Sequence, residues 1–178
     1  MCPSSRPLRR DNQAMEADPA AWGELAAAIV VAAVSFAGLV FVAMSINLDQ
    51  IISLGGIADL ALQGVIVLSA VAISAMVLLV PGQSTALLGL ELLILGAALL
   101  SATWFLSSRS YQATAPAFRT KRVQTALFTS VPGLLVAVGG LSLLLGFGGG
   151  LYWLVPGWIA GVLVGIVNAW VLLVEVKR

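Results

Sequence analysis

The chain has 178 residues, of which 60% are hydrophobic and 10% are charged, and its mean hydropathy is +1.05. Soluble domains carry about 25% charged residues because their surfaces face water, so this composition excludes a soluble globular domain. The lack of histidine and the single cysteine, Cys2, exclude the usual zinc, haem and thiol–disulfide sites, and a net charge of +1 predicts no nucleic-acid partner.

A membrane-spanning helical bundle remains, and long stretches without charged residues place its helices. A helix needs about 20 apolar residues to cross a hydrocarbon layer about 30 Å thick. The sequence predicts an all-α fold with five such spans, at residues 22–46, 57–80, 85–106, 125–145 and 155–174. They form one transmembrane domain, residues 21–178, and we expect residues 1–20 to be a flexible polar tail.

Proline and glycine mark the boundaries between these spans. The segment PGQS at residues 81–84 predicts a tight turn after the second span. The uncharged stretch at residues 123–174 is too long for one helix, and the glycines of residues 146–150 divide it. Pro132 is expected to kink the fourth span or to mark a late start. The alternative is a bundle of four spans, with one of these segments re-entrant or lying at the membrane interface.

Four tryptophans support this division because they fall at predicted span ends. Trp22, Trp104, Trp153 and Trp158 occupy these positions. Indole rings are amphipathic and favour the level of the lipid headgroups. We therefore expect these four side chains to lie at the two membrane surfaces.

The basic residues favour an outside N-terminus and a cytoplasmic C-terminus. Lysine and arginine close to span ends set the orientation of a membrane protein. This orientation places six of them inside: Arg109, Arg119, Lys121, Arg122, Lys177 and Arg178. The basic residues left outside, at positions 6, 9 and 10, lie far from the first span and are diluted by acidic neighbours.

Glu91 is the one carboxylate that lies away from the span ends, inside a predicted span with apolar residues on both sides. A carboxylate in the membrane is costly and must be protonated, hydrogen-bonded or exposed to water. Counting outward from the turn at residues 81–84 places Ser74 at the same depth on the preceding span. The sequence predicts that these residues pair. Glu91 then either contacts an ion, proton or ligand or is held structurally by a neighbouring hydroxyl.

Gln63 and Asn168 form a second candidate pair. Each lies six residues inside its span, about 9 Å from the same membrane face at helical rise. Amide side chains hydrogen-bond between membrane helices, at about 1 kcal/mol or less. The pair either joins two helices by a structural hydrogen bond or contacts a polar ligand.

A stripe of glycines marks the fifth span. Gly157, Gly161 and Gly165 recur every four residues and therefore lie on nearly one helix face. Such a face lets another helix backbone approach closely. The stripe predicts tight helix packing, either within the chain or between copies of a homo-oligomer.

Three short segments resemble an uncharacterised family of small bacterial inner-membrane proteins. They are FVAMSINL at residues 41–48, VPGQS at residues 80–84 and LGLE at residues 88–91. Members of the family are sometimes labelled modulators of FtsH protease, a membrane-anchored AAA protease. The resemblance covers residues 22–106, implies a bacterial inner-membrane location and makes Glu91 part of a recurring pattern. It supplies no reaction.

The residues present favour a non-enzymatic membrane protein that acts through helix–helix association, as a regulator, an accessory subunit or a homo-oligomer. Its expected partners are the lipid bilayer and another membrane protein or a second copy, with no cofactor or metal. The alternative is a small oligomeric ion channel or transporter in which Glu91 lines a polar pathway. An intramembrane enzyme is least favoured because one membrane carboxylate leaves little for acid–base chemistry.

Overall fold

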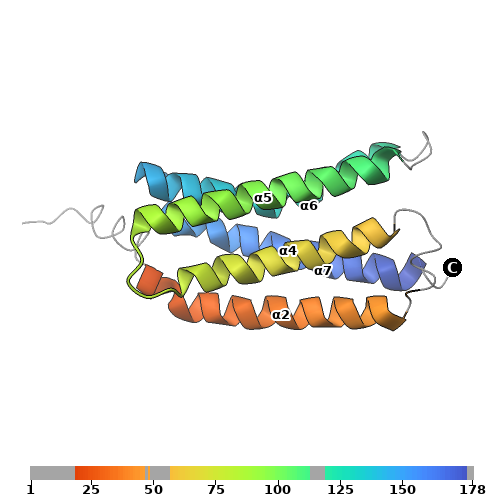
Figure 1. The fold of residues 1–178 in the computed structure, drawn as a ribbon, viewed down its shortest axis with the longest axis horizontal. Coiled ribbons are helices and arrows are strands. Elements are labelled where there is room, and N and C mark those ends of the chain that lie inside the picture. Colours follow the sequence, from red (N-terminus) through yellow and green to blue (C-terminus); the bar gives the residue numbers. More distant parts are fainter. Residues whose placement is uncertain (1–18, 47, 49–56, 113–118, 176–178) are drawn as a thin grey trace, which may run out of the picture.

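The computed structural model describes residues 19–46, 48, 57–112 and 119–175 of the chain. The described residues form five long helices and two short 3-10 helices (Figure 1). All five long helices are long and apolar enough to cross a membrane, which confirms the predicted all-α bundle of five spans. In chain order the elements are η1 (Pro19–Trp22), α2 (Gly23–Ile46), α4 (Ile57–Leu78), α5 (Thr85–Gln112), α6 (Arg119–Leu145), η3 (Gly150–Trp153) and α7 (Leu154–Glu175).

The division of the long uncharged stretch into α6 and α7 makes the four-span alternative wrong. Glycines in the intervening segment provide the break, because Gly146, Gly148 and Gly149 all have positive φ angles. Ser142 fastens the turn to α6: its hydroxyl donates to the carbonyl of Phe147 (2.6 Å) and accepts from the amide of Gly150 (2.9 Å). The prediction of a flexible tail falls mostly on residues 1–18, which lie outside the described residues.

Two helices extend beyond the predicted spans. α5 continues six residues past residue 106, and α6 begins at Arg119, six residues before residue 125. Hydropathy marks the part of a helix that suits hydrocarbon, whereas the hydrogen-bonded helix continues into the polar region. Pro132 lies inside α6 with its side chain buried, so the prediction that it marks a late start is wrong. Membrane helices tolerate an internal proline where neighbouring groups satisfy the backbone.

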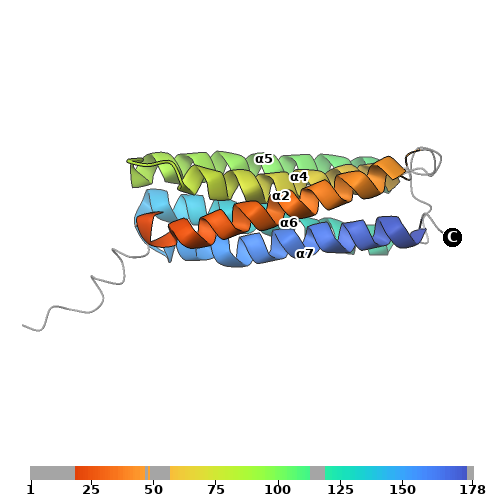
Figure 2. The same ribbon diagram turned by 90° about the horizontal axis from the view of Figure 1, so that it is seen from below.

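The long helices lie side by side along one axis, and consecutive helices run in opposite directions (Figures 1 and 2). α4 lies centrally, in contact with α2, α5 and α7, and 56% of its span is buried. α2 lies at the edge, where only 17% of its span is buried. Its buried residues Ala26, Ala33 and Val40 are seven apart, so a single narrow stripe attaches α2 to the bundle.

α5 and α6 form the closest helix pair of the bundle. A Cβ atom added to Gly140 would lie 2.5 Å from the amide nitrogen of Leu93 and 2.6 Å from the carbonyl oxygen of Gly89. One added to Gly96 would lie 2.5 Å from the nitrogen of Ala137. Only glycine allows backbones this close. This contact was not predicted, since the glycines of α5 and α6 are seven apart and do not form a four-residue repeat.

Candidate functional site

Gln63 connects three helices in the half of the bundle where α5 ends and α6 begins. Its side-chain amide donates to the hydroxyls of Thr129 on α6 (3.0 Å) and Ser107 on α5 (3.3 Å), and lies 3.4 Å from the carbonyl oxygen of Thr103. Gln63, Thr103 and Thr129 are all buried. The structure therefore gives Gln63 the role of a polar clamp, in which one amide holds α4 to α5 and α6.

Asn168 does not pair with Gln63, although the two lie close together. Asn168 packs against Gly64: a Cβ atom on Gly64 would lie 3.3 Å from the Cβ of Asn168. Successive residues of a helix point about 100° apart, so Gln63 faces α5 and α6 while Gly64 faces α7. Within the described part of the chain, the buried side-chain nitrogen of Asn168 has no hydrogen-bond partner. Asn168 therefore lies beside the residue that follows Gln63, but the predicted pairing is wrong.

Ser74 pairs with Trp158, which corrects two predictions. The indole N–H of Trp158 donates to the hydroxyl of Ser74 (2.8 Å), which itself donates to the carbonyl of Val71 (2.8 Å). Ser74 is fully buried and Trp158 is 1% exposed. Trp158 is therefore a core residue of α7 and not an interfacial anchor, whereas the side chain of Trp104 is exposed on the outside of the bundle.

Glu91 contacts the turn that precedes its own helix. Its carboxylate accepts a hydrogen bond from the side-chain amide of Gln83, and both residues are half-buried. The predicted partner, Ser74, faces α7 instead. The predicted pairing of Glu91 with Ser74 is therefore wrong. Glu91 thus lies near the end of the bundle, held within the α4–α5 hairpin.

The glycine stripe of α7 packs inside the chain. A Cβ atom on Gly161 would lie 2.4 Å from a methyl group of Val71, and one on Gly165 would lie 2.6 Å from Leu68, both on α4. Gly157 faces Leu135 of α6. Of the two alternatives for this stripe, the structure supports packing within the chain.

One glycine inside a helix has no such neighbour. A Cβ atom on Gly38, in the middle of α2, would meet no atom of the described residues within 4 Å. Val34 and Val42, one turn to each side, are about half exposed. Ten glycines lie within the long helices beyond their first residue. Nine of them would meet another part of the chain, and Gly38 is the exception; the nine are Gly64, Gly89, Gly96, Gly133, Gly139, Gly140, Gly157, Gly161 and Gly165.

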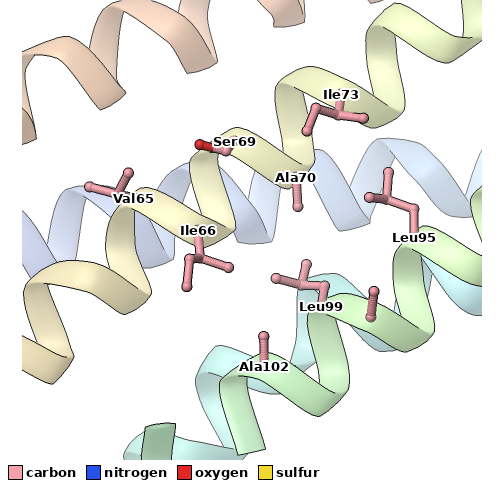
Figure 3. Close-up of a pocket in the computed structure, with 9 residues that line it drawn as sticks. Val65, Ile66, Ser69, Ala70, Ile73, Leu95, Leu99 and Ala102 are labelled. Atoms are coloured by element: carbon pink, nitrogen blue, oxygen red, sulfur yellow. The ribbon is translucent and has the colours of Figure 1, made fainter. Parts of the chain in front are cut away.

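An apolar groove of about 300 Å³ lies between α4 and α5 (Figure 3). Ile66 and Ala70 of α4 point toward Leu99 and Ala102 of α5 across it. Ser69 supplies the one polar side chain of the lining. Pockets for small ligands begin at about this volume. The groove was not predicted from the sequence, because its lining combines residues of two helices.

These features define a polytopic helical membrane protein. Its interior polar groups tie helices together, and no group of three or more metal-ligating side chains occurs among the described residues. Comparisons with protein-family models, with curated proteins and with solved structures find no match to this chain.

Proposed function

We propose that the protein is a non-enzymatic membrane protein that acts through helix–helix association, with the face of α2 around Gly38 as its contact surface. Gly38 carries the proposal. Glycine inside a membrane helix allows another helix to approach closely, and the glycines of α4 to α7 all lie against another part of the chain. Gly38 offers the same close approach, and none of the described residues lies against it.

The surroundings of Gly38 suit a partner helix. Val31, Val34 and Val42 share its side of α2, and all three are exposed. β-branched side chains lose little rotamer freedom when a helix packs on them. The residues that attach α2 to the bundle, such as Ala33 and Val40, lie on the opposite side. The Gly38 face can therefore bind a partner helix without disturbing the bundle.

A substitution at Gly38 tests the proposal. Gly38→Leu fills the face with a bulky side chain, while Ala28→Leu adds the same bulk at another exposed position of α2. A photo-crosslinker at Val34, used in native membranes, should give crosslinked products in the parent chain and with Ala28→Leu. Gly38→Leu should reduce them severalfold. Equal crosslinking in all three proteins would reject this surface.

The mass of the crosslinked product distinguishes association with a second copy of the chain from association with another protein. A product of twice the chain mass would indicate a homo-oligomer, and a product of another mass that contains a second protein would indicate a regulator or accessory subunit. The resemblance of residues 22–106 to modulators of a membrane-anchored AAA protease makes such a protease the first partner to test.

A further inference from the structure

The groove between α4 and α5 lies in the middle of the membrane-spanning part of the chain. Ser69 and Ala70 lie near the centre of α4, and Ala98 and Leu99 near the centre of α5. The two helices are joined at both ends of the groove, by the turn at residues 81–84 on one side and by the Gln63 clamp on the other. The groove is therefore a fixed feature of the α4–α5 hairpin.

A positive charge lies on the same face of α5, toward the end of the helix. At 100° per residue, Ala98, Ala102, Phe105 and Arg109 fall within about 60° of one another. Arg109 is exposed, and its guanidinium lies 5.8 Å from the ring centre of Phe105. This cation–π contact keeps the Arg109 guanidinium on the face of α5 that lines the groove.

The spacing between charge and groove matches one leaflet of a bilayer. Eleven residues separate Ala98 from Arg109, which is about 16 Å at helical rise, and half of a hydrocarbon core is about 15 Å. Arg109 is also the last residue of its membrane span. A molecule with its head at Arg109 and its tail in the groove would thus extend from the headgroup level to the bilayer midplane.

Basic charge along the α4–α5–α6 segment is concentrated at this same end. The first turn of α6 contains Arg119, Lys121 and Arg122, against one acidic residue, Asp59, in the first turn of α4. At the opposite end of these three helices Glu91 is the one charged residue. Each basic residue near a membrane surface attracts anionic lipid. The end of the bundle that contains Arg109 is therefore the end suited to an anionic headgroup.

We propose that the α4–α5 groove binds an acyl chain of an anionic phospholipid whose phosphate pairs with Arg109. The lining accepts an alkyl chain because it is apolar except for Ser69. A volume of about 300 Å³ has room for a segment of an alkyl chain. The groove is formed by α4 and α5, whereas the Gly38 face belongs to α2. The lipid site can therefore be tested independently of the proposed helix–helix association.

Native mass spectrometry of the purified chain tests this site. The protein in mild detergent is mixed with equal amounts of phosphatidylglycerol and phosphatidylcholine, and the retained lipids are counted. The parent should retain phosphatidylglycerol in preference. Arg109→Gln should lower that preference about fivefold, the change expected for one basic residue near a membrane surface.

Two neighbouring alanines provide a matched pair for the groove itself. Ala98 and Ala97 are both exposed on α5, but only Ala98 lines the groove. Ala98→Leu should reduce retention of both lipids, and Ala97→Leu should leave it unchanged. Equal retention of the two lipids by the parent would overturn the proposal. So would a loss of oligomers in Ala98→Leu with lipid retention unchanged, which would make the groove a contact between chains.

Discussion

The indole nitrogen of Trp158 lies 2.8 Å from the hydroxyl oxygen of Ser74, and this buried hydrogen bond joins the first turns of α7 to the last turns of α4. Both side chains are almost completely buried. A buried indole N–H without a partner is costly, so Ser74 is the residue that allows a large aromatic ring to fill the core at this point.

Ser74→Ala should lower the free energy of unfolding by about 1 kcal/mol, because it leaves the Trp158 N–H unpaired. Trp158→Phe should cost more, since it also removes ring volume from the core. Unfolding in mixed detergent micelles measures both variants and the double variant. The two effects should be less than additive. Full additivity would show that the hydrogen bond does not stabilise the protein.

The two buried amides should respond oppositely to the same substitution. Gln63→Leu should destabilise the protein by about 1–2 kcal/mol because it removes a clamp to two helices. Asn168→Leu should leave stability unchanged or raise it, because the side-chain nitrogen of Asn168 has no partner in the described part of the chain. The same unfolding assay compares them. A large loss with Asn168→Leu would indicate that a bound water or ligand satisfies that amide.

The sequence predicts the spans of this protein well because a single physical requirement determines them. Crossing hydrocarbon demands about 20 apolar residues, and the uncharged stretches of the chain satisfy this demand in only a few places. The break between α6 and α7 also follows from local chemistry, since consecutive glycines adopt positive φ angles there. These features depend on residues close together in the chain.

The polar contacts could not be predicted in the same way. Counting residues from a span end gives the level of a side chain along the bundle. Gln63 and Asn168 were counted to the same level, and the structure places Asn168 beside Gly64, the neighbour of Gln63. The rotation of each helix about its axis determines which groups meet, and that rotation depends on packing across the whole bundle. Trp158 illustrates the limit: its position near a span end suggested the membrane interface, but its face of α7 points into the core.

Glu91 should prove dispensable for ion movement. Its carboxylate accepts a hydrogen bond from Gln83 in the same hairpin, near the end of the bundle. This contact explains how a carboxylate is tolerated in the helix without lining an ion pathway. Proteoliposomes containing the parent chain or Glu91→Gln should show the same passive flux of potassium and protons as empty liposomes. A flux that requires the parent Glu91 would instead support the small oligomeric channel.

Gly140→Ala should separate α5 from α6 and destabilise the bundle by about 1–3 kcal/mol, the usual cost of overpacking. The added Cβ would lie 2.5 Å from the backbone nitrogen of Leu93, and backbone atoms cannot move aside as a flexible side chain can. Gly139→Ala provides the control, because its Cβ would lie at an ordinary 3.4 Å from the side chains of Leu154 and Trp153. Alanine also favours helix over glycine, so Gly139→Ala should be neutral or slightly stabilising. Unfolding of the two variants under identical detergent conditions tests the difference. Equal stability would show that the α5–α6 contact is looser than the structure indicates.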